Sequence, residues 1–479
     1  MVGIASYGAY VPLYRLGEQT AGWSGLVEKA IASFDEDSIT MATAAVIDCM
    51  NGMDRGTIGG LYFATTTSPY AEKQAATTIA TAADLRRDAL TMDFTDSLRA
   101  GTNALRAALD AVKASSAKQV MVTAADMRLA QPRSAYEASF GDGAAALLIG
   151  DEEVAISVEG WYSVANEILD VWRSYGETTV DSWEDRFVLD EGYRRVLAEA
   201  IFGLFAKYNV SSKDFAKVVC YAPDARRHTD MARTVGFEPD QVQPLLIGAV
   251  GNTGAAFTLM MLVTALEEAK PGDKILLANY GDGADACILE VNERINKIRD
   301  SRGMKGYMAS KKILGDYQTY AAWRGFIDVA PAVRRPEMVQ PSSTAVWRER
   351  DANIRFHGVR CKSCGYQQYP PQRVCTKCYT KDNFEDVRFS DKKGTVFTYA
   401  MDYLAPTSDP PLVIAVIDFE GGGRMVSMVT DRDINKIEVG MSVELTFRKL
   451  FTAKGVHNYY WKSMPLRTGL GGNPGDRPR

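Results

Sequence analysis

A four-residue sequence, Gly-Asp-Gly-Ala, occurs twice in the chain and constrains its fold more than any other feature. The first copy begins at Gly141 and the second at Gly281, 140 residues later. Each copy follows an aromatic residue and opens a short apolar segment. Glycines at matching places in both copies indicate a shared tight turn in which a side chain would clash. We interpret the pair as an internal duplication, with residues 1–155 and 156–291 forming two related halves.

Short apolar segments alternate with segments of helical length through both halves. The expected strands are Gly3–Ala9, Gly60–Thr65, Leu90–Phe94, Gln119–Ala124, Ala144–Gly150, Val154–Val164, Lys217–Tyr221, Lys274–Tyr280 and Ala286–Val291. The expected helices are Ser38–Met50, Ala71–Ala83, Ala100–Ala114, Gly192–Phe205, Ala225–Thr234 and Thr253–Ala265. This alternation predicts an α/β fold with a largely parallel sheet covered by helices.

Four of the seven cysteines form two Cys-x-x-Cys pairs, and the other three stand alone. The paired cysteines are Cys361, Cys364, Cys375 and Cys378. Four thiolates on two turns predict a closed tetrahedral Zn²⁺ site without an open position for catalysis, so we expect a structural zinc ribbon over residues 356–390. The solitary Cys49, Cys220 and Cys287 lie in apolar segments, where we expect buried packing residues. This uneven distribution favours a reducing compartment over a disulfide framework.

Residues 292–355 carry more charge and less periodicity than the two halves. We expect a helical connector whose aromatic residues Tyr317, Tyr320, Trp323 and Phe326 pack on a neighbouring element. Residues 391–468 contain five short segments that alternate apolar and polar residues, which predicts a small β-barrel of the OB type. These segments are Gly394–Tyr403, Leu412–Phe419, Met425–Val429, Ser442–Phe447 and Tyr459–Met464. We expect the Gly/Pro-rich residues 469–479 to be a flexible tail.

The bulk composition excludes several classes of protein. The net charge of −5 argues against a nucleic-acid binder, and the barrel strands lack the dense basic and aromatic alternation of such proteins. No apolar run approaches the roughly 20 residues of a membrane span. The chain begins without the pattern of a signal peptide, so we expect a cytoplasmic protein.

The segment Asp93–Leu105 joins an expected strand to an expected helix through a tight turn. α/β enzymes present a nucleophile in this way, with the helix N-terminus behind it. Asp96 and Ser97 are residues of the N-cap type. The segment nevertheless contains no strongly reactive side chain.

Several sequences resemble, in order, the 3-hydroxy-3-methylglutaryl-CoA synthase branch of the thiolase superfamily. They are GIASYGAYVP, FATTTSPYAEKQAA, DFTDSLRAGTNAL, SFGDGAAALLIG, VVCYAPDARRH and VGNTGAAF. The C-terminal part resembles the zinc-ribbon and OB-fold domain (domain of unknown function 35) that occurs beside thiolase-like enzymes. The resemblance implies a duplicated thiolase-like fold with two βαβαβαββ halves in αβαβα layers. It also implies a homodimer and a coenzyme A thioester bound in a buried tunnel.

The departures from this family concern its catalytic residues. Leu98 stands where the synthases carry their nucleophilic cysteine, and Tyr221 stands at the position of their histidine. The general-base glutamate falls near Thr66 or Thr67, and the family's asparagine is retained as Asn252. Leucine cannot take up an acyl group, so the acyl-cysteine route is not supported.

We therefore expect acyl-CoA carbon–carbon bond chemistry of the aldol, retro-aldol or Claisen type. Tyr221 would move a proton at the substrate's alkoxide, and Asn252 with backbone N–H groups near Gly251 would hold the thioester oxygen. The alternative for Tyr221 is a residue that fills the space of the missing histidine. Arg226 and Arg227 are expected to bind the CoA phosphates, with a solvated helix face as the alternative.

Two other functions remain open. Ser97 could be a substitute nucleophile in a synthase-like acyltransferase, but it needs a base, and of three histidines only His228 lies near the pocket segment. Capping the Ala100 helix is the simpler role for Ser97. The chain could also be a non-catalytic, CoA-binding subunit that docks onto an active thiolase.

Overall fold

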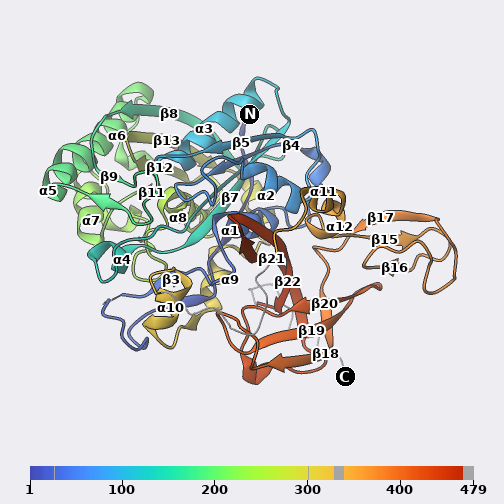
Figure 1. The fold of residues 1–479 in the computed structure, drawn as a ribbon. Helices are drawn as coiled ribbons and strands as arrows, with labels where there is room; N and C mark the ends of the chain where they lie inside the picture. The colour runs from blue at the N-terminus through green and yellow to red at the C-terminus, as the bar shows by residue number, and fades with distance from the viewer. Residues whose placement is uncertain (26, 300, 328–338, 468–479) are drawn as a thin grey trace.

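The computed structural model describes residues 1–25, 27–299, 301–327 and 339–467. The expected flexible tail, residues 469–479, lies outside this range. Figure 1 shows a layered core, an OB barrel beside it and a zinc ribbon that projects from the barrel side of the molecule. Among the described residues, no helix is long and apolar enough to cross a membrane.

A nine-stranded sheet forms the centre of the core. Its strands are β1 (Gly3–Tyr10), β4 (Ile58–Ala64), β5 (Leu90–Phe94), β6 (Gln119–Asp126), β7 (Gly143–Gly150), β8 (Ile156–Ala165), β11 (Lys217–Cys220), β12 (Lys274–Tyr280) and β13 (Gly283–Val291). They lie in the order β11-β12-β13-β8-β1-β7-β6-β4-β5. The expected strands therefore all form, with ends that differ by a few residues.

The prediction of a largely parallel sheet is wrong. Only β4–β5, β4–β6 and β11–β12 pair in parallel. The pairings β6–β7, β7–β1, β1–β8, β8–β13 and β13–β12 are antiparallel. Strand β13 follows β12 directly through the second Gly-Asp-Gly turn, and short connections of this kind favour antiparallel pairing. Between β6 and β7 the chain contains the short helix α4 (Ala135–Ser139).

The two halves share one topology, which supports the internal duplication. The first half runs β5-β4-β6-β7-β1, with two parallel pairings followed by two antiparallel ones. The second half runs β11-β12-β13-β8, and Val242 forms a parallel bridge to Val218 at the outer edge of β11. That bridge occupies the place that β5 has in the first half. The strands that begin at the two Gly-Asp-Gly-Ala sequences, β7 and β13, are therefore equivalent.

Helices cover this sheet in layers. They are α1 (Ser38–Cys49), α2 (Ala76–Ala82), α3 (Ala100–Lys113), α4 (Ala135–Ser139), α5 (Asp185–Phe187), α6 (Arg195–Tyr208), α7 (Ala225–Thr234) and α8 (Phe257–Leu266). Helix α8 is buried on nearly every side and contacts α3, as expected for a central helical layer. The expected helix Ala71–Ala83 begins only at Ala76, and a π-helix, Val188–Arg194, precedes α6.

The connector packs its aromatic residues as predicted. It contains α9 (Gly303–Ala309), β14 (Lys312–Ile313), α10 (Tyr317–Trp323), α11 (Ser343–Arg348) and α12 (Arg350–Asn353). Strand β14 pairs with β2 (Tyr14–Leu16), which pairs with β3 (Lys29–Ile31). The ring of Trp323 lies 5.1 Å from that of Tyr14, and Tyr317 stacks on Trp23 at 5.9 Å. The remaining short strands, β9 (Val171–Trp172) and β10 (Asp181–Ser182), pair with each other.

The C-terminal part forms a zinc ribbon and a closed barrel. The ribbon strands are β15 (His357–Cys361), β16 (Gln367–Gln368) and β17 (Phe384–Arg388). The barrel strands are β18 (Gly394–Asp402), β19 (Leu412–Phe419), β20 (Arg424–Met428), β21 (Ser442–Ala453) and β22 (Val456–Pro465). They lie in the order β20-β19-β18-β21-β22, and a parallel bridge from Val429 to Ser463 joins the two ends. The predicted five-stranded OB barrel is confirmed.

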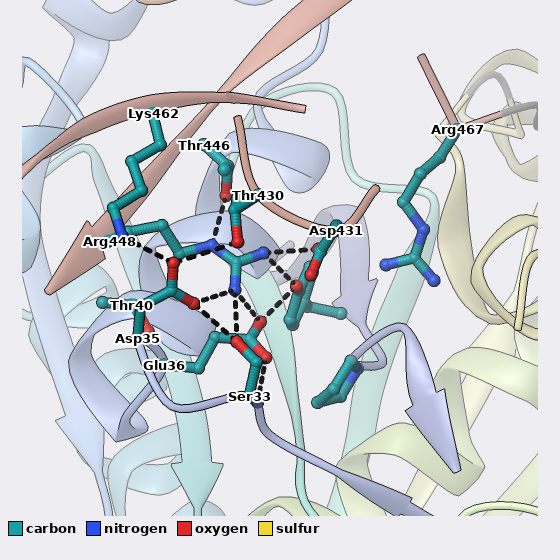
Figure 2. Close-up of polar contacts among 12 residues, drawn as sticks. Ser33, Asp35, Glu36, Thr40, Thr430, Asp431, Thr446, Arg448, Lys462 and Arg467 are labelled. Carbon is teal, nitrogen blue, oxygen red and sulfur yellow. Dashed lines mark hydrogen bonds and ion pairs between the residues drawn. The ribbon is translucent and has the colours of Figure 1, made fainter. Parts of the chain in front are cut away.

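A buried charge cluster fixes the barrel on the core (Figure 2). Arg448 of β21 contacts Asp35 at 3.2 Å and Glu36 at 2.8 Å, both just before α1, and Asp431 of the barrel at 2.6 Å. Lys462 of β22 contacts Asp35 at 2.8 Å. Although burial acts in the opposite direction, these two cations hold the pKa of Asp35 well below its usual range. The barrel and the core are therefore joined by buried ion pairs from both sides.

Candidate active site and zinc site

The turn between β5 and α3 presents Leu98 where the family resemblance places a nucleophile. Asp96 in this turn has a φ of 69°, a conformation that side chains other than glycine rarely adopt. Leu98 is 7% exposed, and its carbonyl accepts a hydrogen bond from the Asn279 amide at 3.3 Å. Its surroundings are those of a packed core residue.

Ser97 does not cap helix α3, so the expected capping role is wrong. The N-cap residue is Arg99, and no side chain completes the cap. The Ser97 hydroxyl accepts a hydrogen bond from the Arg99 N–H at 3.2 Å and donates one to the Gly281 carbonyl at 3.3 Å. Both partners are backbone groups, and neither can activate the hydroxyl as a base.

The two Gly-Asp-Gly turns each support a segment of the opposite half. A Cβ atom on Gly281 would lie 3.0 Å from the Cβ of Leu98, so the second turn packs directly against the Leu98 turn. A Cβ atom on Gly141 would lie 1.8 Å from the Val250 carbonyl oxygen, so the first turn packs against the Asn252 loop. The duplicated glycines therefore bring these two turns close to the site.

Tyr221 follows the last residue of β11, in a buried cluster of aromatic rings. Its hydroxyl oxygen accepts a hydrogen bond from the Asn252 amide at 3.2 Å. The rings of Tyr193, Tyr280 and Phe257 lie 5.9–6.2 Å from its ring. Burial raises the pKa of Tyr221 to about 12, against the opposing effect of the positive charge on Arg128. The phenol is therefore protonated near neutral pH and can donate a proton or a hydrogen bond.

The loop that carries Asn252 is held rigidly. The Asn252 N–H donates to the Ser139 carbonyl at 2.7 Å, and its side-chain oxygen accepts from the Gly254 N–H at 3.0 Å. Among the backbone N–H groups near Gly251 that were expected to hold the thioester oxygen, that of Gly251 donates to the Leu246 carbonyl at 3.2 Å. The Asn252 side chain remains the donor of this loop that points to the Tyr221 hydroxyl.

A carboxylate that the sequence analysis missed organises the threonines at the glutamate position. Asp126, the last residue of β6, accepts hydrogen bonds from Thr65, Thr66 and Thr67 at 2.7–2.9 Å. It also accepts one from the Ala255 N–H at 2.8 Å. The sequence could have indicated Asp126, because it is a polar residue at the carboxyl end of an expected strand. Ligand sites of α/β sheets lie at such ends.

Helix α1 contacts the threonine segment, and the OB barrel contacts the residues that follow it. The Ser38 hydroxyl at the start of α1 donates to the Thr67 carbonyl at 2.8 Å. The His457 N–H of β22 donates to the Tyr70 hydroxyl at 2.8 Å. Ser38 belongs to the core, so the barrel's direct contact with this segment is the one that His457 makes at its end.

The basic residues expected to bind CoA phosphates lie on the surface. Arg226 of α7 has a side chain that is 88% exposed, with only a distant contact to Asp230. Arg227 forms an ion pair with Asp224 at 2.5 Å. His228 is buried, and burial lowers its pKa to about 4, so it is neutral near pH 7. No hydrogen bond links His228 to Ser97 among the residues that the structure describes.

The solitary cysteines are packing residues, as predicted. Cys49, Cys220 and Cys287 are all buried. Burial raises the pKa of Cys49 and of Cys220 to about 12 and raises that of Cys287 as well. These thiols are therefore protonated and do not supply a thiolate nucleophile.

The four paired cysteines converge on one point in the zinc ribbon. Their sulfur atoms all lie within 4.8 Å of one another. The Cys361–Cys378 and Cys364–Cys375 sulfur pairs are each 3.6 Å apart. Four thiol ligands at such spacings fit a tetrahedral Zn²⁺ ion, whose closed coordination makes it structural.

Removal of one of these ligands is expected to release the metal. We expect the wild-type protein to contain one zinc ion per chain by elemental mass spectrometry, and Cys364→Ser to contain well under half of that. Proteolysis should then begin within residues 356–390, because the ribbon's folding depends on metal binding. Lys362→Ala, between two ligands, is the matched control. A Cys364→Ser protein with full zinc content would contradict this assignment.

Comparisons with known proteins identify the class. Residues 205–291 match the family described as 3-oxoacyl-[acyl-carrier-protein (ACP)] synthase III C terminal. Residues 348–385 match the ChsH2 rubredoxin-like zinc ribbon domain, and residues 386–448 match the ChsH2 C-terminal OB-fold domain. The fold and these matches define a thiolase-superfamily protein with a fused zinc ribbon and OB barrel.

The relatives identify the family within this class. The hydroxymethylglutaryl-CoA synthase of Methanopyrus kandleri is 33% identical over 337 residues, which cover 67% of this chain and 96% of that protein. The hydroxymethylglutaryl-CoA synthase of Thermococcus sibiricus is 34% identical over 341 residues, covering 68% and 96%. This chain belongs to the hydroxymethylglutaryl-CoA synthase family.

Solved structures share the fold of the core. PksG, an HMG-CoA synthase from Bacillus subtilis, has a TM-score of 0.61 and 17% identity, and the match covers 68% of this chain and 89% of PksG. MvaS in complex with 3-hydroxy-3-methylglutaryl coenzyme A has a TM-score of 0.59 and 18% identity, with coverage of 70% and 94%. The family acts in acyl-CoA carbon–carbon bond chemistry, and this is the class of enzyme to which the chain is assigned.

Proposed function

We propose that this protein makes or breaks the C2–C3 bond of a 3-hydroxyacyl- or 3-oxoacyl-CoA without an acyl-enzyme intermediate. The supporting observation is the buried pair of Tyr221 and Asn252, whose side chains are 3.2 Å apart. Leu98 occupies the nucleophile's place, and the three solitary cysteines are buried and protonated. Aldol chemistry needs a proton shuttle and a stabilised enolate, and it needs no nucleophile.

In the cleavage direction, the 3-hydroxyl gives up its proton as the C2–C3 bond breaks. The electron pair of that bond forms the thioester enolate, and the 3-carbon leaves as a carbonyl compound. Protonation of C2 then yields the shorter acyl-CoA. The phenolate form of Tyr221 accepts the proton of the 3-hydroxyl, and the phenol so formed returns this proton to C2. The Asn252 amide donates a hydrogen bond to the developing oxyanion. Because the pKa of Tyr221 is about 12, this phenolate is the minor form near neutral pH.

Incubation of the purified protein with 3-hydroxyacyl-CoA esters tests this function. We expect acetyl-CoA or propionyl-CoA to form together with an aldehyde or ketone, detected by liquid chromatography and mass spectrometry. A Ser97-dependent acyltransferase would instead release free CoA and acylate Ser97. A non-catalytic subunit would turn over no ester and would copurify with a cysteine-bearing thiolase.

The edge strand β5 favours a homodimer. It lies at the end of the nine-stranded sheet, and Leu90 and Met92 on it are 41% and 38% exposed. Exposed apolar edge strands invite pairing with a second strand. Pairing of β5 with its copy would continue the sheet into a second chain and cover both side chains.

A charge on this strand is expected to separate the dimer. Met92→Lys would place two cations against each other across the shared edge, so we expect a monomer in size-exclusion chromatography with light scattering. Val426→Lys, on an exposed position of the barrel, is the matched control and should leave the mass unchanged. A dimeric Met92→Lys protein would contradict pairing through β5.

A further inference from the structure

Two aromatic side chains project into solvent from the segment that joins β9 to helix α6. Trp183 is 68% exposed, and Phe187 of helix α5 is 55% exposed. Strand β9 pairs with β10, with Val171 opposite Ser182. Leu169, which is 60% exposed, therefore lies beyond the same end of this hairpin as Trp183. Large apolar side chains that gather on a surface mark an interaction site.

An open hollow of about 580 Å³ lies directly after Trp183 in the chain. Two of its acids form ion pairs along the helix, Asp190 with Arg194 at 3.0 Å and Glu191 with Arg195 at 2.9 Å. The other two form no ion pair within the part of the chain that the structure describes. The hollow is lined by four carboxylates, one guanidinium and one aromatic ring, those of Glu184, Asp185, Asp190, Glu191, Arg186 and Phe187. We call these lining residues, with Trp183 and Leu169, the acidic aromatic surface.

The sign of the charge limits what this surface can bind. Residues 166–191 contain eight acidic residues and two arginines. Their excess of negative charge is larger than the net charge of −5 of the whole chain. Such a surface repels nucleic acids, anionic membranes and acidic proteins, and it attracts cationic groups.

Neither a metal ion nor a second copy of this chain fits the surface well. Over the described residues, the four cysteines of the zinc ribbon are the one group of side chains spaced to hold a metal ion. A twofold contact through the acidic aromatic surface would place the same acids of two chains against each other, and their repulsion opposes association. Helix α5 also lies at the outer edge of the core, away from β5 and from the barrel (Figure 1).

One helix connects this surface to the candidate active site. The π-helix Val188–Arg194 begins at the hollow and carries Tyr193, whose hydroxyl donates to the Tyr221 carbonyl at 3.1 Å. A Cβ atom on Gly192 would lie 2.5 Å from the Tyr280 hydroxyl oxygen, so this helix packs closely on the aromatic cluster. π-Helical turns occur frequently at functional sites. A partner bound at the hollow would therefore contact the helix that packs on Tyr221.

We propose that the acidic aromatic surface docks a partner protein through a segment that carries lysine or arginine beside apolar residues. This inference goes beyond the proposed function and does not depend on it. The partner's cations would pair with Glu184 and Asp185, and they would lie over the exposed rings of Trp183 and Phe187 as cation–π contacts. Its apolar side chains would cover Leu169 and Trp183, and tryptophan is enriched among the residues that dominate binding energies.

Fluorescence anisotropy with labelled peptides tests this surface on the full chain. The probe is a short peptide of leucine and lysine with amphipathic helical spacing, and two counterparts replace its leucines by serine or its lysines by glutamate. We expect the leucine–lysine peptide to bind at least about tenfold more tightly than the serine–lysine peptide, because only the former buries apolar area. The leucine–glutamate peptide should not bind. Charge reversal by Glu184→Lys with Asp185→Lys should weaken the leucine–lysine peptide at least about tenfold, and Trp183→Ala should weaken it at least about fivefold.

Asp151→Lys with Glu152→Lys is the matched control. These adjacent acids are also exposed and form no ion pair among the described residues, so the change should alter the affinity less than about twofold. Equal losses in both double variants would overturn the proposal, because general acidity explains that result. Equal binding of the leucine–lysine and serine–lysine peptides, or full displacement by spermine, would also overturn it, because a site for small cations explains both. Failure of the leucine–lysine peptide to bind the wild type would overturn the docking surface and leave the proposed function standing.

Discussion

Substitution of Arg448 by methionine is expected to lower the free energy of unfolding by about 3–5 kcal/mol, the cost of breaking a buried ion pair by removing one partner. The change would leave Asp35, Glu36 and Asp431 buried with Lys462 as the remaining cation of the cluster (Figure 2). Burial already raises the pKa of Glu36, although Arg448 opposes this effect. Urea unfolding monitored by tryptophan fluorescence would measure the loss.

A surface ion pair supplies the control for this prediction. Arg424 pairs with Asp418 on the exposed side of the barrel, so Arg424→Ala should change the stability by less than about 1 kcal/mol. Arg448→Met should also shift the barrel's unfolding to lower urea than that of the core, because the cluster joins the two. A stability within 1 kcal/mol of the wild type would show that the cluster does not hold the barrel.

Loss of the Tyr221 hydroxyl is expected to reduce kcat by about 10²–10⁴-fold, the usual contribution of a positioned acid–base group. Tyr221→Phe retains the ring and its contacts with Tyr193, Tyr280 and Phe257, so we expect KM and the melting temperature to change little. Steady-state kinetics with the best 3-hydroxyacyl-CoA would measure the effect.

Tyr7→Phe is the matched control for Tyr221→Phe. Tyr7 is also buried, burial also raises its pKa, and its hydroxyl has no hydrogen-bond partner among the described residues. Removal of that hydroxyl should leave kcat unchanged. If Tyr221→Phe kept wild-type turnover, Tyr221 would be a residue that fills the space of the missing histidine, as the alternative interpretation holds.

Local sequence pattern predicted the elements of the core and of the barrel. Strands Leu90–Phe94 and Lys274–Tyr280 and helix Ala225–Thr234 have the predicted ends, because apolar periodicity and turn residues determine them locally. The Gly-Asp-Gly-Ala pair indicated the duplication, which the matching strand orders support. The pairing direction of the strands was predicted wrongly, as largely parallel, since it depends on which strands meet in space.

Site residues that the family motifs place by their position in the sequence were predicted. Residues whose roles depend on contacts between distant segments were missed. Tyr221 and Asn252 were identified and lie in contact. Asp126 was missed because its role depends on partners that only the folded chain brings to it. The expectation for backbone N–H groups near Gly251 stays a prediction, although the N–H of Gly251 itself donates to the Leu246 carbonyl. The Arg448 cluster joins residues more than 400 positions apart, which no local pattern reports.

The mass of the intact protein during turnover shows whether the reaction proceeds without an acyl-enzyme intermediate. We expect a shorter acyl-CoA to form from a 3-hydroxyacyl-CoA while the rapidly quenched protein keeps its unmodified mass, and we expect Ser97→Ala to remain active. An added mass equal to the acyl group, located on a peptide containing Ser97 and absent from an inactive Ser97→Ala protein, would contradict it.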